Sequence, residues 1–346
     1  MNISDFDYEL PPELIAREPV RPRDASRMMV VDRRRDSYTD SFFGELPRYL
    51  DPSDVLVLND TRVIRARLHG KLLRAAGTSR EVEVLFAGRV EENVWEVLCR
   101  PGRRIRKGDR IVFGSGKLEG TFGENRGQGT RLLNVNASQP VEDLLDQYGH
   151  IPLPPYINRE NNAADNIDYQ TVYASASGAI AAPTAGLHFT ESMLQALKAR
   201  GIEAVKITLH VGIGTFIPVR AEDPRKHVLR PERFELSEHN AARLNAAQET
   251  GRRIIAVGTT TTRTLEHVMN RYGRFEPCKG EADLFILPGF EFKAVGAMLT
   301  NFHLPQSTLL MLVSAFATRE TILKAYRHAV ENQYRFYSYG DCMLII

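Results

Sequence analysis

The sequence predicts an α/β protein into which a small antiparallel β-barrel is inserted. Residues 66–136 hold six short β-type segments separated by Gly-rich breaks, with no helical period among them. Such a pattern is typical of a small barrel or sandwich. The flanks instead alternate helices with strands, which indicates a largely parallel or mixed sheet covered on both faces. We therefore expect a discontinuous α/β domain, residues 1–65 and 137–346, and an inserted barrel domain, residues 66–136.

The barrel segments have the composition of short, half-buried strands. In the second of them, Val82, Val84 and Phe86 alternate with other residues, which is the two-residue period of a strand with one buried face. The six expected strands are Ala66–Leu73, Glu81–Val90, Val94–Arg100, Arg110–Phe113, Leu118–Glu124 and Arg131–Asn136.

The flanking elements carry start and stop signals. Thr190 and Ser237 are suited to cap the amino ends of two helices that end at Gly201 and Gly251. A third helix is expected over Glu320–Tyr334, where apolar residues recur at amphipathic spacing. The apolar runs expected to form buried strands are Val55–Leu58, Ala204–Leu209 and Ile254–Val257.

The composition excludes several classes of protein. The chain has 346 residues, of which 43% are hydrophobic, and a net charge of only +2. Its apolar runs, such as Leu309–Val313, are far shorter than the ~20 residues of a membrane span. The acidic start lacks the pattern of a secretion signal, so we expect a cytoplasmic protein. Three scattered cysteines disfavour a disulfide framework or a cysteine zinc site.

Positive charge is concentrated in two runs. Residues 100–110 hold six basic side chains against one acid, and residues 17–35 hold seven arginines. Such runs can follow a phosphate backbone, or they can be solvated faces. The side chains of the first run that we expect to contact nucleic acid are Arg100, Arg103, Arg104, Arg106 and Lys107.

Four blocks place polar residues among Gly and Pro at the ends of apolar runs. They are Ala181–Phe189, Thr208–Phe216, Val257–Arg263 and Thr300–Thr308. Polar groups delivered from strand ends on Gly-containing turns form small-molecule sites in α/β domains, which predicts an enzyme.

Three of these blocks carry a histidine: His188, His210 and His303. None has a second ligand at helical spacing, which disfavours a metal centre. General acid–base catalysis suits an imidazole near neutral pH. For each histidine alone, a buried structural role remains open.

Two further motifs admit a binding role and a structural one. Gly258–Arg263 precedes a helix expected to start near Thr262, and it could hold an anion or simply cap that helix. Val211–Ile217 contains Gly-x-Gly after a strand, but Ile217 stands where a dinucleotide fingerprint needs Gly. Its glycines could admit a ligand or only form a turn.

Two more motifs could have either a binding role or a structural one. Asn59–Arg62 could anchor a substrate or form a turn at the end of a strand. The aromatic stretch Tyr334–Asp341, which includes Tyr339, could stack a base or seal the core.

Taken together, these blocks resemble the S-adenosylmethionine:tRNA ribosyltransferase-isomerase family of queuosine biosynthesis. The resemblance extends from the start of the chain to residue 345 in the same block order. The motifs that carry it are Asn59–Val63, Gly149–Tyr156, Ala181–Phe189, Thr208–Phe216, Val257–Thr260, Thr300–Thr308 and Tyr334–Asp341.

The resemblance implies an α/β domain with a β-barrel insertion, in agreement with the pattern of strands and helices. It also implies transfer and isomerisation of the ribosyl part of S-adenosylmethionine onto 7-aminomethyl-7-deazaguanine at the tRNA wobble position. Epoxyqueuosine is formed, and adenine and methionine leave. S-adenosylmethionine is then a substrate, no metal or redox cofactor is implied, and we expect a monomer.

Block position and this chemistry suggest roles for individual residues. We expect His188 and His303 to transfer protons and His210, with Thr208, to position the sugar. We expect Arg263 with Thr260 to hold the methionine carboxylate, and Arg62 with Asn59 to hold the deazaguanine or a phosphate. The further expected substrate contacts are Asp60, Thr184, Asn301 and Tyr339.

Two rival functions come from other classes. A non-catalytic RNA-binding module would explain the barrel and the basic runs but not the His-bearing blocks. S-adenosylmethionine binding without RNA would argue against it. A metal-dependent hydrolase would need stoichiometric metal in the purified protein.

Overall fold

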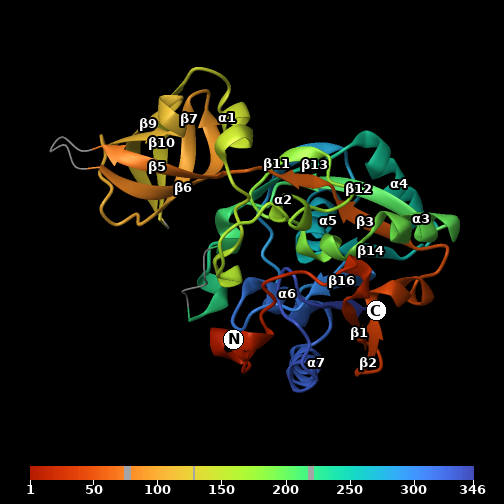
Figure 1. Ribbon diagram of the computed structural model, residues 1–346. Helices are drawn as coiled ribbons and strands as arrows, with labels where there is room; N and C mark the ends of the chain where they lie inside the picture. Colours follow the sequence, from red (N-terminus) through yellow and green to blue (C-terminus); the bar gives the residue numbers. More distant parts are fainter. Residues whose placement is uncertain (74–78, 128, 217–221) are drawn as a thin grey trace.

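The computed structural model describes residues 1–73, 79–127, 129–216 and 222–346. A closed six-stranded barrel stands beside a larger lobe built on a nine-stranded mixed sheet (Figure 1). The predicted fold class, an α/β domain with an inserted antiparallel barrel, is confirmed. Ile217, which argued against a dinucleotide fingerprint, lies outside the described residues.

The large sheet places four parallel strands side by side. Their residues alternate between two apolar layers: Val55 and Val57 pack on one face, and Leu56 and Leu58 on the other. This double burial explains why the runs are continuously apolar. In spatial order the strands are β15 (Cys278–Ala282), β13 (Glu232–Leu236), β12 (Glu203–Leu209), β3 (Val55–Asn59), β14 (Ile254–Val257), β16 (Ala297–Asn301), β17 (Cys342–Ile345), β1 (Arg27–Asp32) and β2 (Ser37–Phe42). Of these, β12, β3, β14 and β16 run parallel to one another.

Helices cover both faces of this sheet. One face carries α4 (Glu238–Glu249), α5 (Thr259–Tyr272), α6 (Thr308–Phe316) and α7 (Arg319–Glu331). The other carries α3 (Glu191–Ala199) and the 3₁₀ helices η4 (Phe43–Tyr49) and η7 (Thr184–His188). The remaining 3₁₀ helices are η1 (Ile3–Phe6), η2 (Pro12–Leu14), η3 (Arg23–Ala25), η5 (Gly114–Gly116), η6 (Pro155–Ile157), η8 (Ile213–Phe216) and η9 (Pro224–Lys226).

The predicted helix starts agree with the structure except at α5. The Thr190 hydroxyl accepts a hydrogen bond from Met193 N at 3.1 Å, and Ser237 one from Asn240 N at 3.3 Å. The expected start near Thr262 is wrong, because α5 already begins at Thr259. Gly258 has φ of 96°, which glycine adopts without steric cost, so the chain turns into the helix directly after β14. The last helix, expected to reach Tyr334, ends at Glu331.

The barrel consists of six strands, each antiparallel to its two neighbours, and aromatic side chains fill its interior. Phe86, Phe113 and Phe122 are buried in its interior, as the alternation around Phe86 predicts. Gly70 permits this packing, since a Cβ there would lie 2.6 Å from the Phe113 ring. The strands are β5 (Arg67–Leu73), β6 (Ser79–Glu91), β7 (Val94–Arg100), β8 (Arg110–Phe113), β9 (Leu118–Gly127) and β10 (Thr130–Ala137).

Two neighbouring chain segments connect the barrel to the large lobe. Arg67 and His150 exchange backbone hydrogen bonds, with Arg67 N to His150 O at 3.2 Å and His150 N to Arg67 O at 2.8 Å. Helix α1 (Val141–Tyr148) belongs to the barrel core through Leu144 and Leu145. The boundaries predicted at 66 and 136 stay a prediction, and the packing of α1 favours a second boundary near Gly149.

The larger lobe also contains a small parallel pair and a short helix near these connections. Strand β4 (Thr61–Val63) pairs with β11 (Ala176–Ala179), and helix α2 spans Asp165–Asp168. Among the described residues, no helix has the length and apolar character needed to span a membrane.

Gly149→Ala is expected to destabilise the protein by about 3 kcal/mol, at the upper end of ordinary overpacking costs. A Cβ at Gly149 would overlap the carbonyl oxygens of Arg65 and Leu145, which are backbone atoms and cannot rotate away. The free energy of unfolding from a urea titration measures the effect. Gly280→Ala is the control, because its new Cβ would lie 3.5 Å from the Phe234 ring, an ordinary contact. Equal unfolding midpoints for the two variants would contradict the prediction.

Candidate functional site

Polar residues follow four neighbouring parallel strands where these strands end. Strands β12, β3, β14 and β16 terminate at one edge of the sheet, which in α/β proteins is where ligands bind. The structure thereby brings many of the predicted site residues to one edge. They are Asn59, Asp60, Thr208, His210, Thr260, Asn301 and His303.

Asp60 and His210 lie where the neighbouring strands β3 and β12 end. Asp60 Oδ1 accepts a hydrogen bond from Thr208 Oγ1 at 2.7 Å, and its Oδ2 accepts one from Ser175 Oγ at 2.6 Å. His210 Nδ1 lies 2.8 Å from Thr61 Oγ1. This bond fixes the orientation of the imidazole and leaves Nε2 as the ring nitrogen that a ligand can use.

Asn59 joins strand β3 to its neighbour β12. Its side-chain Nδ2 donates to Leu209 O at 2.9 Å, and its Oδ1 accepts from Leu209 N at 3.0 Å. The side chain is fully buried. These bonds give Asn59 a structural function beneath His210, and its predicted contact with the deazaguanine stays a prediction.

A cavity of about 550 Å³ opens between this edge and the barrel. His210 lines it from the large lobe, whereas Phe86 and Trp95 line it from the barrel. Glu142 and Asp146 are the acids of its lining, and four arginines outnumber them: Arg62, Arg65, Arg89 and Arg233. This excess of positive charge suits an anionic ligand such as a phosphodiester.

The arginines of the cavity come from both lobes. Arg62 donates to Ala174 O and Arg65 to Asp146 O, each at 2.8 Å, so both guanidinium groups are positioned by backbone carbonyls. Arg233 extends from β13 to barrel strand β6, where a Cβ at Gly88 would lie 3.2 Å from its Nη2. Within the described ranges, the Arg233 guanidinium makes no hydrogen bond or ion pair, which leaves it to a ligand.

The imidazole of His210 is neutral at physiological pH. Partial burial lowers its pKa, and the positive charge of Arg233 lowers it further, whereas Asp60 and Glu235 oppose the shift. A neutral imidazole facing a cavity can accept a proton.

His188 lies inside the protein, with none of its surface exposed. Its Nδ1 is 2.7 Å from Ser26 Oγ. Its Nε2 and Asn301 Oδ1 are both buried, and the interaction between these two side chains opposes the lowering of the His188 pKa. Burial, reinforced by the charge of Arg23, lowers the pKa of His188 to about 3. In this structure the ring does not reach the cavity, and its predicted proton transfer has no geometric support.

His303 is also an interior residue. Its Nε2 lies 2.8 Å from Thr300 Oγ1, and its backbone N–H donates to the Tyr326 hydroxyl at 2.9 Å. Burial lowers its pKa to about 3. These contacts match the structural role that the sequence left open, and they leave its predicted proton transfer equally unsupported.

The first turn of α5 lies against η7. A Cβ at Gly258 would be 3.8 Å from Ala185, the residue after Thr184. The hydroxyls of Thr261 and Thr262 donate to Val257 O at 2.7 Å and Gly258 O at 3.1 Å. For Thr184 and Thr260 the described structure gives no ligand-like contact, and their substrate roles stay predictions.

Arg263 is committed to a protein carboxylate. It is buried on the second turn of α5 and forms an ion pair with Glu232 of β13, whose Oε1 accepts from Gly212 N at 3.0 Å. Burial lowers the pKa of Arg263 to about 10, so it stays protonated at neutral pH. The ion pair occupies the guanidinium, and the predicted contact with a methionine carboxylate has no support here.

The aromatic stretch near the end of the chain seals the core. Tyr334, Phe336 and Tyr339 have no exposed surface. Tyr339 meets Tyr169 edge-on at 6.0 Å, and its hydroxyl lies 3.5 Å from Asp165 Oδ1. Of the two roles left open, the structure shows core packing, because no face of Tyr339 is free to stack a base or substrate.

The two basic runs differ in the contacts and the exposure of their side chains. Several arginines of residues 17–35 are structural: Arg23 donates to Leu187 O at 2.8 Å, Arg33 donates to Phe316 O at 3.1 Å, and the Arg27 guanidinium lies 3.6 Å from the Tyr334 ring centre. These contacts show a structural role for the three side chains, and the phosphate-contact interpretation of this run stays a prediction. The predicted nucleic-acid residues of the barrel are exposed: Arg100, Arg103, Arg104, Arg106 and Lys107.

Sequence reasoning missed three arginines of the cavity, Arg65, Arg89 and Arg233. They come from distant parts of the chain, and no spacing signal connects them before the barrel folds against the sheet. In the described part of the chain, no group of three or more His, Cys, Asp or Glu residues is arranged to hold a metal ion.

A family profile described as "Queuosine biosynthesis protein" matches residues 3–345. The chain belongs to this queuosine biosynthesis protein family. Two curated members, from Symbiobacterium thermophilum and Moorella thermoacetica, are each 50% identical to it over the full length of both chains. Both are named S-adenosylmethionine:tRNA ribosyltransferase-isomerase.

A solved structure agrees with this assignment to the queuosine biosynthesis protein family. The crystal structure of S-adenosylmethionine tRNA ribosyltransferase from Thermotoga maritima is 39% identical and covers 99% of this chain and 100% of its own, with a TM-score of 0.57. The resemblance seen in the sequence is confirmed, and with it the prediction of an enzyme of the transferase and isomerase type.

Proposed function

We propose that this enzyme transfers the ribosyl part of S-adenosylmethionine to the aminomethyl group of 7-aminomethyl-7-deazaguanine at the wobble position of tRNA. The sugar is rearranged to an epoxycyclopentane, giving epoxyqueuosine, and adenine and methionine are released. The names of full-length relatives at 50% identity support the two substrates. The observation that carries the proposal is the cavity in which His210 and four arginines meet between the two lobes.

The two sides of the cavity suit the two substrates. Arg62 and Arg233 offer positive charge to the phosphates around the wobble nucleotide, whereas Arg89 is paired with Glu142 at 3.5 Å. Asp60 and Thr208 are hydrogen-bonded to each other behind the cavity residue His210, and we propose that they contact the ribose of S-adenosylmethionine. We place the sugar at the strand edge and the RNA backbone toward the barrel.

His210 is the proposed proton acceptor. The sulfonium of S-adenosylmethionine acidifies the adjacent 5′ carbon, so a neutral imidazole can remove a proton there. The protonated ring can then return the proton to adenine as it leaves. We assign this role to His210, because His188 and His303 are enclosed in the interior whereas His210 lines the cavity.

The apolar wall of the barrel side supports the same chemistry. Phe86 and Trp95 are almost fully buried where they border the cavity. An opened sugar is reactive toward water, and apolar walls limit its hydrolysis before the amine attacks. The proposed reaction consumes S-adenosylmethionine as a substrate and needs no metal or redox cofactor. We further propose that the enzyme acts as a monomer in the cytoplasm.

The test combines purified enzyme, S-adenosylmethionine and an anticodon stem-loop that carries 7-aminomethyl-7-deazaguanine. We expect adenine and methionine to appear by chromatography in equal amounts, and the RNA to gain the mass of the rearranged sugar. A stem-loop with guanine at the same position is the control. Unchanged RNA with neither product released would refute the proposal.

Charge reversal on the barrel is expected to weaken RNA binding. Arg103 and Arg106 are exposed in the basic run. Each side chain that neutralises one phosphate contributes about 0.7–0.9 to the slope of log K against log salt, so the double variant should reduce the slope by roughly 1.4–1.8. Filter binding of tRNA to Arg103→Glu/Arg106→Glu at several salt concentrations measures this slope. Lys198→Glu is the control, since Lys198 is exposed on α3, far from the barrel (Figure 1). An unchanged slope would make the run a solvated face.

A further inference from the structure

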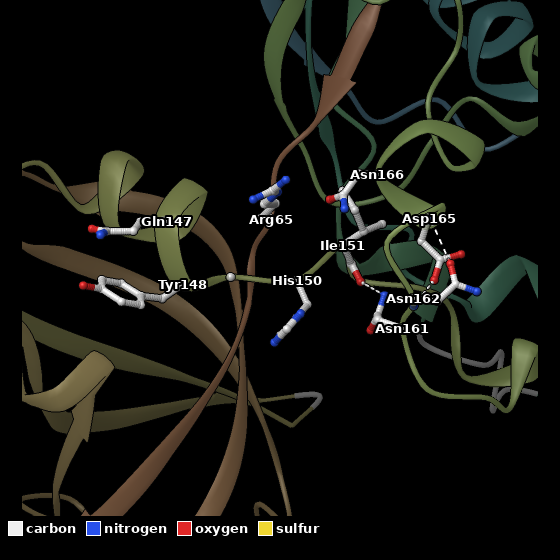
Figure 2. A pocket seen from close by; sticks show the side chains of 10 residues that line it. Arg65, Gln147, Tyr148, His150, Ile151, Asn161, Asn162, Asp165 and Asn166 are labelled. Carbon is white, nitrogen blue, oxygen red and sulfur yellow. Dashed lines mark hydrogen bonds between the residues drawn. The ribbon is translucent and has the colours of Figure 1, made fainter.

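Two cavities border the connection between the lobes, and a histidine lines each of them. His210 lines the larger cavity of about 550 Å³, and His150 lines a smaller one of about 240 Å³. Figure 2 shows His150 among the residues of the smaller cavity, on the chain segment that follows α1. Within the described residues, the ring nitrogens of His150 make no hydrogen bond, whereas Nδ1 of His210 is bonded to Thr61. Of the two rings, His210 is therefore the one that the protein holds in a fixed orientation.

The Thr61 hydroxyl contacts both His210 and a backbone carbonyl. Thr61 Oγ1 donates to Ala176 O at 3.4 Å and lies 2.8 Å from His210 Nδ1. Thr61 has no exposed surface, so water does not compete for its hydroxyl. A hydroxyl has one proton to donate, and a carbonyl oxygen can only accept. With that proton on the carbonyl, the Thr61 oxygen accepts from Nδ1–H, and Nε2 of His210 keeps its lone pair.

The pairing of β4 with β11 holds the carbonyl of Ala176 in place. Thr61 stands opposite Ala176 in this parallel pair. The backbone N–H groups of Ser175 and Ala176 both donate to Asp60 O, at 2.7 and 3.2 Å. The start of β11 is thereby tied to the residue before Thr61, and the hydroxyl and its two partners form one fixed unit at the cavity edge.

An irregularity in β11 supports the His210 ring from a second direction. The register of the pair shifts between Ser177 and Ala179, which places Gly178 at a bulge. Gly178 has φ of 148°, and a Cβ there would lie 2.8 Å from His210 Cε1 and 2.9 Å from its Nδ1. The missing side chain lets the imidazole pack directly on the backbone. Bulges beside active sites commonly reorient a side chain in this way.

We propose that Thr61 is a positioning residue, and that β4 and β11 together hold His210 as the tautomer protonated on Nδ1, with the Nε2 lone pair available to the cavity. This inference rests on the proton-acceptor role proposed above for His210, because that role needs an unprotonated Nε2. The proton from the 5′ carbon then goes to Nε2. The charged ring donates from both nitrogens, so the bond from Nδ1 to Thr61 persists through the step.

The first test detects the tautomer without tRNA or S-adenosylmethionine. In protein labelled with ¹⁵N-histidine, long-range ¹H–¹⁵N spectra at about pH 8, above the ordinary histidine pKa, distinguish the protonated ring nitrogen from the unprotonated one. The His210 signal, identified by its loss in His210→Ala, is expected to report a proton on Nδ1. In Thr61→Val, which keeps the shape but removes the acceptor, the proton should move to Nε2. Thr61→Ser should keep the wild-type spectrum, and the signal of His150 should be the same in every variant.

The second test measures adenine release in single turnover. The rate should fall at least about tenfold in Thr61→Val, the effect of one lost hydrogen bond to a reacting group, and Thr61→Ser should restore it. Gly178→Ala should also lower the rate, because the new Cβ displaces the ring. Gly289→Ala is its matched control, since Gly289 also has a positive φ, 99°, and a Cβ there meets nothing within 4 Å.

The outcomes separate this inference from the proposed function. A wild-type proton on Nε2 would overturn the inference, and so would a Thr61→Val variant that loses rate while the proton stays on Nδ1. Either result, obtained with active wild-type enzyme, leaves the proposed function standing. Absence of turnover by the wild type would instead refute the proposed function, and the spectra would still decide the tautomer.

Discussion

His210→Ala is expected to lower the single-turnover rate of adenine release about 10²- to 10⁴-fold, the usual contribution of a general acid or base. The fold should be retained, because the His210 ring contacts Thr61 at the cavity edge and is not part of a core cluster. His239→Ala is the control, since His239 is an exposed histidine on α4.

The pH dependence adds a second signature to this prediction. The pKa of His210 lies below its ordinary value, so the proton-accepting form persists as pH falls through 6.5. The wild-type rate should stay level from pH 8 to the ordinary histidine pKa and decline only below it. Arg233→Gln removes a charge that lowers this pKa, and the decline should then begin at higher pH. If folded His188→Ala loses more rate than His210→Ala, proton transfer belongs to the interior histidine after all.

Arg263→Ala is expected to lower the free energy of unfolding by about 3–5 kcal/mol, the usual cost of breaking a buried ion pair from one side. The variant leaves the carboxylate of Glu232 buried without its partner. A denaturant titration followed by circular dichroism measures the loss. Arg271→Ala, at an exposed position of the same helix, should change stability by less than about 0.5 kcal/mol. Wild-type stability combined with weaker S-adenosylmethionine binding would instead support a ligand contact for Arg263.

Local signals in the sequence were sufficient for most of the fold. The strands Val94–Arg100, Arg110–Phe113 and Ile254–Val257 have the predicted bounds, because turns and apolar runs delimit them sharply. The helix caps at Thr190 and Ser237 depend on hydroxyls within three residues of their partners. The start of α5 was not predicted because its N-cap residue, Gly258, has no side chain to accept a capping hydrogen bond. Its positive φ also leaves no mark in the sequence that would distinguish it from any other glycine.

The site was predictable only in outline. Polar residues at strand ends predicted the edge of the sheet at which the structure has a cavity, since that rule depends on strand direction alone. The sequence did not show which of the candidate site residues are buried. His188, His303 and Tyr339 occur in motifs of the same kind as those of His210 and Arg62. Elements far away in the chain nevertheless enclose His188, His303 and Tyr339. The cavity arginines could not be found because they are brought together only by the placement of the barrel.

The paired backbones of Arg67 and His150 bear on how this architecture could have arisen. The chain leaves the large lobe and returns to it at adjacent points, so a short link across that junction would leave the strand order of the nine-stranded sheet untouched. Gain or loss of the whole barrel is thus feasible as one genetic event. A single-lobe form of the chain would keep Asp60 and His210 at the ends of β3 and β12 but would lack the barrel residues Phe86, Arg89 and Trp95 that line the cavity.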